Sequence, residues 1–225
     1  MTGTVVVAGT GPLLGAAVAR EFAAAGWSVG LFARSTEFTE TLAAEIRDEG
    51  GEAVAVSADV TDPAEVEAGF ETVRSALGRV EVVVHNASVM SSGPIDHADP
   101  ESFERVWRVR AYGGYLCVRA ALPDLRATEG TVIFSGTNYA RDGPGEMIDW
   151  ASGAAATRAL SRSLADYLAD DGVQVTYASI AASVASDGDT RGSTAVWDHD
   201  VAETYRQLAE NDSAVAAEID IRPRG

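Results

Sequence analysis

Short apolar runs alternate with amphipathic stretches along this chain of 225 residues, and this alternation sets the expected architecture. Runs of four to six residues rich in Val, Ala and Ile are typical of parallel strands buried on both faces, and the stretches between them carry apolar residues at helical spacing. The expected strands are 5–8, 29–33, 53–56, 80–84, 131–134, 173–178 and 217–221. One expected helix follows the first strand and ends near Ala25. The others cover about 63–77, 99–122, 150–168 and 201–210. The pattern predicts an α/β fold, a doubly wound parallel sheet of about seven strands with helices on both faces.

The turn after the first strand is rich in glycine, with Gly9, Gly11 and Gly15 inside seven residues. A residue without Cβ lets main-chain N–H groups close on a pyrophosphate at a helix N-terminus. The next strand ends at Arg34, close to the spacing of about 20 residues at which the ribose is bound in dinucleotide sites. With no linker or repeat in the chain, the sequence predicts a single Rossmann-type dinucleotide-binding domain over residues 1–225.

The residue type at position 34 bears on the choice of nucleotide. An acidic residue there accepts hydrogen bonds from the ribose and selects NAD, whereas an arginine pairs with a 2′-phosphate. Ser35 offers a second donor. NADP(H) is therefore the expected cofactor and NAD the less favoured one. The alternative is that Arg34 merely ends a strand at the surface.

The charge balance is strongly acidic, with 34 acidic residues against 17 basic ones and a net charge of −17. Every base is arginine, since the chain contains no lysine. This balance argues against nucleic acids and anionic membranes as partners. The acidic surface resembles that of proteins from salt-accumulating halophiles. A GC-rich genome is the alternative, because it replaces lysine by arginine, although it does not by itself double the acids.

Composition also bears on compartment and metal content. No run approaches the roughly 20 apolar residues of a membrane span, and the N-terminus lacks a basic signal-peptide region, so a cytoplasmic protein is expected. The single cysteine, Cys117, excludes an internal disulfide and is expected in the core rather than as a nucleophile. Three scattered histidines and one cysteine offer no metal-ligand spacing, so no metal is expected.

Three motifs follow expected strands: Gly9-x-x-x-Leu13-x-Gly15, Asp59-Val60 and Asn86-Ala87-Ser88. In this order and spacing the chain resembles the short-chain dehydrogenase/reductase family over essentially its whole length. The family pattern is Gly-x-x-x-Gly-x-Gly, so Leu13 replaces a glycine and is expected to narrow the approach to the cofactor. The resemblance implies cofactor contacts from Gly9, Gly11, Leu13, Leu14, Gly15, Arg34, Ser35, Asp59, Val60, Asn86 and Ala87.

The resemblance also locates four catalytic positions, and this chain departs from the family at each. The family's tyrosine falls on Trp150 and its lysine on Ala154. Its serine falls on Thr137 and its asparagine on Arg110. Indole N–H is a donor only and does not titrate usefully, so Trp150 cannot act as a general acid or base. We expect these four positions to lie outside the core.

Other side chains are candidates to replace the lost acid. Tyr139 is the preferred one, and Tyr112 is expected at the rim of the same cleft, with Arg110 lowering the pKa of a nearby phenol. Tyr139 as an ordinary loop aromatic is the alternative. His85 either donates to a ligand or is a strand-end residue bonded to backbone. The candidate catalytic residues are Thr137, Tyr139, Arg110 and Trp150.

Two functional hypotheses follow. The first is an NADP(H)-dependent oxidoreductase acting on a carbonyl or alcohol of an unidentified small molecule, with weak or absent activity. The second is a non-catalytic pseudoenzyme, a nucleotide sensor or a structural subunit; another chemistry in the same pocket is left open. The resemblance further implies a homo-dimer or homo-tetramer, through the 150–168 helix and the 219–221 strand. It also implies a substrate lid over 183–198, polar and short here.

Overall fold

The computed structural model describes residues 3–91, 93–186 and 194–224. Its strands are β1 (Thr4–Ala8), β2 (Ser28–Ala33), β3 (Ala53–Ser57), β4 (Val80–His85), β5 (Thr131–Thr137), β6 (Gln174–Ile180), β7 (Ser183–Ala185), β8 (Ala195–Trp197) and β9 (Glu218–Ile221). Its helices are α1 (Leu14–Ala24), α2 (Glu37–Asp48), α3 (Pro63–Leu77), α4 (Pro100–Trp107), α5 (Gly113–Thr128), α6 (Ile148–Tyr167) and α7 (Asp198–Ala209). Single turns are η1 (Arg108–Tyr112), a π-helical segment, and the 3₁₀ turns η2 (Asn138–Ala140) and η3 (Ala169–Asp171).

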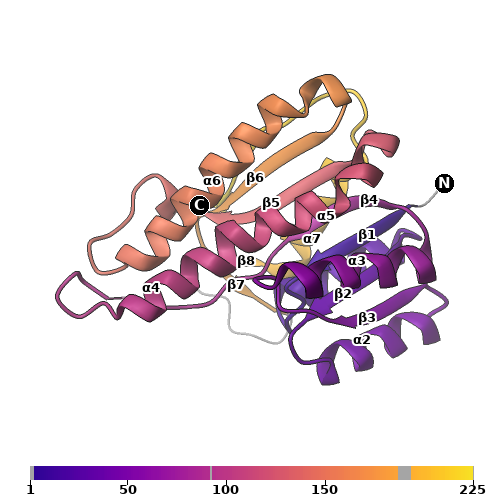
Figure 1. Cartoon of the computed structure of the whole chain (residues 1–225), viewed down its shortest axis with the longest axis horizontal. Helices are drawn as coiled ribbons and strands as arrows, with labels where there is room; N and C mark the ends of the chain where they lie inside the picture. The colour runs from indigo at the N-terminus through magenta and orange to yellow at the C-terminus, as the bar shows by residue number, and fades with distance from the viewer. Residues whose placement is uncertain (1–2, 92, 187–193, 225) are drawn as a thin grey trace.

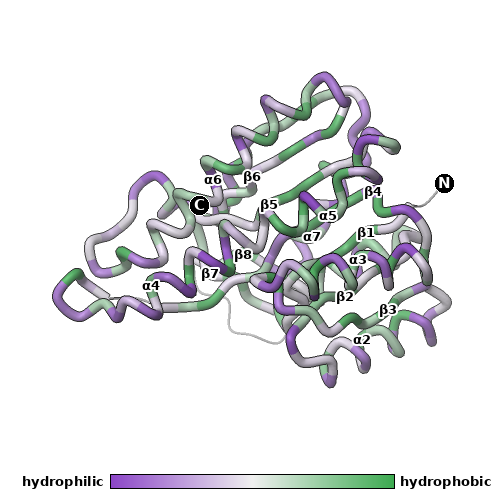
Figure 2. The backbone as a smooth tube through the Cα atoms, in the orientation of Figure 1, coloured by the Kyte–Doolittle hydropathy of each residue, from purple (hydrophilic) through white to green (hydrophobic). Residues whose placement is uncertain are grey.

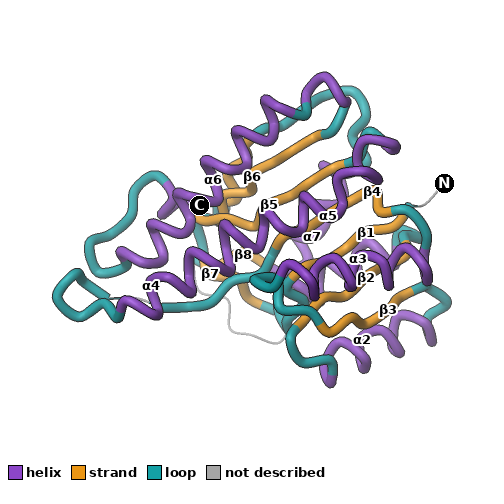
Figure 3. The backbone as a smooth tube through the Cα atoms, in the orientation of Figure 1, coloured by secondary structure: helices purple, strands orange, loops and turns teal. Residues whose placement is uncertain are grey.

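Seven strands form one parallel sheet in the order β3-β2-β1-β4-β5-β6-β9 (Figure 3). The chain runs outward from β1 to β3, returns to pair β4 with β1, and then runs outward in the other direction. The carboxyl ends of β1 and β4 therefore flank the point where the direction of winding reverses, which is where doubly wound sheets bind ligands. This confirms the predicted fold class.

Alternate residues of the central strands face two separate hydrophobic clusters. Val5 and Val7 of β1 belong to the cluster that contains residues of α1, α2 and α7, whereas Val6 and Ala8 belong to the cluster with residues of α3 and α5. Figure 1 shows α3 and α5 in front of the sheet, and Figure 2 shows apolar residues concentrated on its strands. Burial on both faces explains why the strands are continuous apolar runs rather than alternating ones.

Most expected elements form, with shifted ends. Helix α3 begins as predicted, because the Asp62 carboxylate accepts from the N–H groups of Ala64 and Glu65 and Pro63 occupies the first turn. Helix α2 is not among the expected elements, although Leu42 and Ile46 lie one turn apart on its buried face. The helix expected over 99–122 is interrupted by the π segment η1 and extends to Thr128.

The expected lid over 183–198 has structure at both ends. Strands β7 and β8 pair in parallel there, with Val184 opposite Val196. The stretch 187–193 lies outside the described residues. In the described part of the chain, no helix combines the length and apolar character that a membrane crossing needs.

Candidate functional site

A cleft of about 580 Å³ opens at the carboxyl ends of β1 to β4. It is lined by the turn 9–15, by residues 32–35 after β2, by 58–60 after β3 and by 86–89 after β4. Three further side chains complete it: Arg105, Val109 and Val184. All eleven residues predicted to contact the cofactor lie in this lining, so the structure brings them together at one site.

The glycine turn packs directly against the segment that follows β4. Gly9 has φ +95°, and a Cβ built on it would lie 2.4 Å from the Cα of Ala87. The Asn86 side-chain amide donates to the Gly9 carbonyl at 3.0 Å. Only glycine permits both the positive φ and this approach, so Gly9 and Asn86 together fix the shape of the turn.

Open space lies beside Gly11 and the start of α1. A Cβ built on Gly11 would have no atom within 4 Å, so its backbone faces open space. No described side chain caps α1, and the first N–H groups of a helix have no intrahelical acceptor. The N–H of Ala16 donates to the Gly11 carbonyl at 2.9 Å, so the N–H groups of Leu14 and Gly15 are the ones available to a bound anion. Leu13, 38% exposed, lies at the rim, and the cleft remains open beside it.

The part of the cleft that follows β2 and β3 combines a cation with a fixed carboxylate. Arg34 is exposed immediately after β2. The Asp59 carboxylate accepts from both the N–H and the hydroxyl of Thr61 at 2.8 Å. Burial raises the pKa of Asp59, but these bonds, with Arg34 and Arg108 nearby, outweigh it and leave the pKa below its ordinary value. Asp59 is therefore an ionised acceptor beside Arg34 at neutral pH.

Thr137, which stands at the position of the family's serine, lies at the end of β5 next to the buried Tyr177. The hydroxyl of Tyr177 accepts from the N–H of Thr137 at 3.0 Å and donates to its carbonyl at 3.1 Å. The Thr137 hydroxyl accepts from the Tyr139 N–H at 3.4 Å and donates to the Asn138 amide oxygen at 3.3 Å. The backbone of Thr137 is thus held firmly, while its hydroxyl makes only long bonds.

Arg110 is buried beside this strand end, with 4% of its surface exposed. Its guanidinium carbon lies 4.3 Å from the ring centre of Trp150 on α6, and its Cδ lies 3.4 Å from a Cβ built on Gly153. Burial lowers the pKa of Arg110, an effect that Tyr177 opposes. Ala154 is fully buried. The expectation that the four catalytic positions lie outside the core is therefore wrong for Arg110 and Ala154, because α6 packs against the segment that carries Arg110 and buries both side chains.

The two tyrosines named as rim candidates have different neighbours. Tyr112 stacks between Trp107 and Tyr115, both of which are at least 40% exposed. Tyr139, half-buried, lies in η2 next to Thr137. The phenol within electrostatic range of Arg110 is that of Tyr177, whose pKa burial raises and Arg110 lowers. Sequence reasoning missed Tyr177, because a tyrosine inside an apolar strand has the pattern of an ordinary core residue.

His85 and Cys117 are interior groups. His85 Nε2 lies 3.2 Å and 3.1 Å from the carbonyls of Val109 and Arg110, so Nε2 carries the hydrogen. Burial lowers the pKa of His85 to about 4; the bond to Val109 opposes this shift and the charge of Arg110 adds to it. Of the two alternatives for His85, a donor to a ligand or a strand-end residue bonded to the backbone, the structure shows the second. Burial raises the pKa of the Cys117 thiol to about 12, which fits a core residue.

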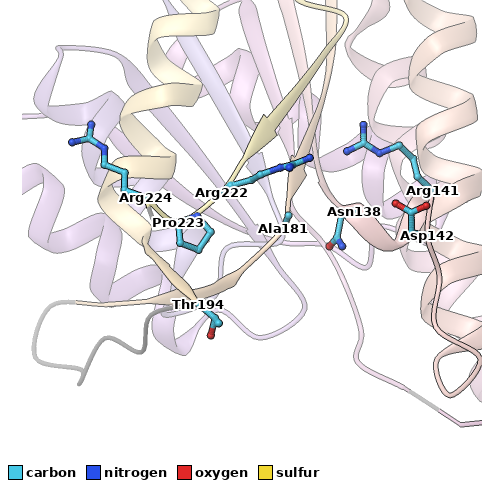
Figure 4. Close-up of a pocket in the computed structure, with 8 residues that line it drawn as sticks. All are labelled: Asn138, Arg141, Asp142, Ala181, Thr194, Arg222, Pro223 and Arg224. Carbon is cyan, nitrogen blue, oxygen red and sulfur yellow. The ribbon is translucent and has the colours of Figure 1, made fainter.

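A second cavity, of about 600 Å³, lies at the carboxyl ends of β5, β6 and β9 (Figure 4). Three of its lining residues are arginines, and Figure 4 shows Arg222 reaching across the cavity from the chain end opposite Arg141. Both of these arginines pair with Asp220, Arg222 at 3.2 Å. Among the described residues, no three His, Cys, Asp or Glu side chains gather in a metal-binding group.

The sequence pattern of the short chain dehydrogenase family matches residues 3–191. The chain belongs to this family. Short chain dehydrogenases are oxidoreductases, and the cleft at the winding reversal is in the position that their fold predicts for a nucleotide.

Several relatives have assigned activities. The chain is 35% identical over 177 residues to 3beta-hydroxysteroid dehydrogenase 1 of Eggerthella lenta, covering 76% of this chain and 67% of that protein. It is 32% identical over 136 residues to versicolorin reductase stcU of Emericella nidulans, covering 60% of this chain and 51% of that one. The match to the versicolorin reductase and to three other curated relatives spans about half the length of each of those proteins.

Solved short chain dehydrogenase structures superpose over nearly the whole chain. An alcohol dehydrogenase from Thermococcus sibiricus, complexed with 5-hydroxy-NADP, matches with a TM-score of 0.91 at 23% identity, covering 99% of this chain and 97% of that one. A metagenomic short-chain oxidoreductase in complex with NADP matches with a TM-score of 0.86 at 27% identity and the same coverage.

Proposed function

We propose that this chain binds NADP(H) in the cleft beside the glycine turn and acts as a weak oxidoreductase on a carbonyl or alcohol. The observation that carries the proposal is the lining of that cleft, in which the open backbone at Gly11, the free start of α1 and exposed Arg34 follow one another. A dinucleotide needs this sequence of contacts for its pyrophosphate and its 2′-phosphate. The NADP complexes of similar structures support the same choice over NAD.

The residues present fit such a cofactor, which supplies or accepts a hydride when bound. The remaining requirement is a proton at the substrate oxygen. Thr137 can donate a hydrogen bond to that oxygen, since its present bonds are long and are readily exchanged. Trp150 cannot deliver a proton, so the proton comes from Tyr139 or from water. Loss of a positioned general acid slows such a step by about 10²–10⁴-fold.

The second candidate is a non-catalytic member that binds nucleotide as a sensor or structural subunit. The replacement of the family's tyrosine and lysine by Trp150 and Ala154 favours it. The two candidates share the nucleotide site and differ in turnover. NADPH binding combined with no NADPH oxidation across a panel of aldehydes, ketones and oxo acids would select the second.

Calorimetric titration with NADPH, NADP⁺ and NADH in molar KCl tests the shared part. We expect NADPH to bind and Arg34→Ala to weaken that binding by about 10- to 100-fold, the value of one or two charge-assisted hydrogen bonds. NADH binding should change little. Arg79→Ala is the matched control, because Arg79 is exposed just before β4, at the amino end of this strand and thus opposite the carboxyl ends that line the cleft. Absence of binding by every nucleotide would overturn the proposal.

We also propose that the protein assembles as a homo-dimer or homo-tetramer in the cytoplasm, with a small-molecule substrate and neither nucleic acid nor membrane as partner. Support for assembly comes from Phe103, Trp107 and Tyr115, large side chains 40–44% exposed along α4 and α5. Light scattering coupled to gel filtration in molar KCl tests it, and a mass near 23.4 kDa would contradict it.

A further inference from the structure

We infer that the guanidinium of Arg110 binds a carboxylate group of the substrate, which makes the substrate class a small oxo acid or the matching hydroxy acid. This inference rests on the proposed function, since it names the substrate of the same site.

Arg110 has no anionic partner in the described part of the chain. Its guanidinium makes no hydrogen bond or ion pair there, and Nε is buried without an acceptor. The ionisable groups that face it are His85 and Tyr177, both neutral at pH 7. A buried charge without a counter-ion is strongly unfavourable, so proteins keep one where a ligand completes the pair.

The rest of the molecule shows how unusual this is. Three partly buried arginines elsewhere have carboxylate partners: Arg74 with Asp124 at 2.7 Å, Arg158 with Glu218 at 2.8 Å and Arg206 with Glu21 at 2.7 Å. The chain holds twice as many acids as bases, 34 against 17. Partners are therefore abundant, and the one catalytic-site arginine lacks them.

The contact with Trp150 does not replace an anion. The guanidinium carbon of Arg110 lies over the ring face of Trp150, and an indole ring offers no hydrogen-bond acceptor to the five N–H donors of arginine. The ring therefore offsets part of the charge and leaves the donors without acceptors. A planar carboxylate supplies what is missing, since it accepts two parallel N–H bonds.

The position of Arg110 ties this carboxylate to the reacting end of the substrate. Arg110 packs against Trp150 and Gly153 of α6, the helix that carries the positions of the family's tyrosine and lysine. Tyr177, which also faces Arg110, holds the backbone of Thr137 through two hydrogen bonds. Thr137 is the residue available to bind the substrate carbonyl. A carboxylate at Arg110 and a carbonyl at Thr137 then belong to one small molecule, an oxo acid. Only 4% of Arg110 is exposed, so binding must shift the half-buried indole of Trp150.

The competing location is the second cavity, which holds Arg141, Arg222 and Arg224. Arg141 and Arg222 already share the Asp220 carboxylate there, and Arg141 also pairs with Glu218 at 3.3 Å. Its charge is largely neutralised from within the protein, so we favour Arg110, and the experiment includes the second cavity as a separate arm.

The test uses acetate, pyruvate, acetoacetate and benzoate, with the uncharged methyl esters of the last three, at constant KCl. We expect at least one carboxylate to raise the melting temperature and to change tryptophan emission, and its ester to do neither. Arg110→Met should weaken that binding at least tenfold. Arg108→Met is the matched control. Arg108 lies on the same π segment but is exposed, with its guanidinium carbon 5.4 Å from the ring centre of Tyr112. The Arg108→Met variant should bind carboxylates as tightly as the wild type does.

Three further measurements keep the outcome decisive. Arg110→Lys, which keeps the charge without the two-pronged geometry, should bind more weakly than the wild type and more tightly than Arg110→Met. The emission change should vanish in Trp150→Phe. NADPH binding should be unaffected by Arg110→Met, because Arg110 does not line the cofactor cleft. If the wild-type protein binds no NADPH, that result counts against the cofactor proposal and not against the carboxylate site. The inference is overturned if no carboxylate binds, if binding survives in Arg110→Met, or if only the Arg222→Gln/Arg224→Gln double variant abolishes it.

Discussion

Trp150 and Ala154 lie one turn apart on α6, and Arg110 from the neighbouring π segment lies against the same stretch of helix. A long side chain placed at 154 would point back along the helix toward Trp150 and into the guanidinium. The cation that the family carries on α6 is thus matched here by a cation from a different element. Restoring the family's catalytic pair must take Arg110 into account.

The double variant Trp150→Tyr/Ala154→Lys should therefore fail for a structural reason. Two cations would share one buried space, and we expect the free energy of unfolding to fall by roughly 3 kcal/mol, the scale for an uncompensated buried charge. Adding Arg110→Asn should recover most of the loss and produce NADPH-dependent carbonyl reduction. Urea unfolding and NADPH oxidation measure the two effects. A stable, active double variant would show that Arg110 does not compete for this space.

His85 predicts a specific pH dependence of stability. Above pH 6.5 the imidazole is neutral in both the folded and unfolded chain and has no effect. As the pH falls from 6.5 to about 4, the unfolded chain takes up a proton that the folded one excludes, so stability is lost by up to roughly 3 kcal/mol. His85→Asn should remove this component. Unfolding free energies of both proteins from pH 7 to 4 test it, and parallel profiles would contradict it.

At the scale of elements, the sequence predicts the helix over 99–122 but not the π segment η1 that interrupts it. Apolar periodicity locates a helix over 99–122, but a π segment of one turn is too short to be recognised from the spacing of apolar residues. The gathering of the eleven candidate cofactor residues in one cleft is predictable, because each motif coincides with the end of a strand. Tyr177 and the burial of Arg110 are not, since both depend on side chains from separate elements meeting across the sheet.

The start of α3 gives a prediction that belongs to this scale. Asp62 accepts N–H bonds at 2.8 Å and 3.1 Å, and it is preceded by the segment that places Asp59 in the cleft. Asp62→Ala should lower the free energy of unfolding by about 1 kcal/mol. Asp62→Asn, which keeps the acceptor without the charge, should recover most of it. Equal losses in both variants would assign the effect to charge rather than to capping.

At the scale of the whole molecule, the excess of 17 negative charges opposes the compact state. Ion pairs such as that between Arg20 and Glu45, with N and O 2.5 Å apart, neutralise part of the surface charge. The chain nevertheless has twice as many acidic residues as basic ones, so half of the carboxylates remain without a compensating positive charge. Exposed pairs of this kind contribute little to stability, so the unmatched acids dominate the salt response.

Salt should therefore stabilise this protein far more than an ordinary one. At 0.1 M salt the Debye length is about 10 Å, and at 1 M about 3 Å, so concentrated KCl removes most repulsion between exposed carboxylates. We expect the melting temperature to rise by at least about 10 °C between 0.1 M and 2 M KCl. Replacing four exposed acids, Glu40, Glu49, Asp166 and Asp212, by their amides should reduce this rise. If the melting temperature is instead the same at both salt concentrations, the arginine-only composition reflects a GC-rich genome rather than a halophilic source.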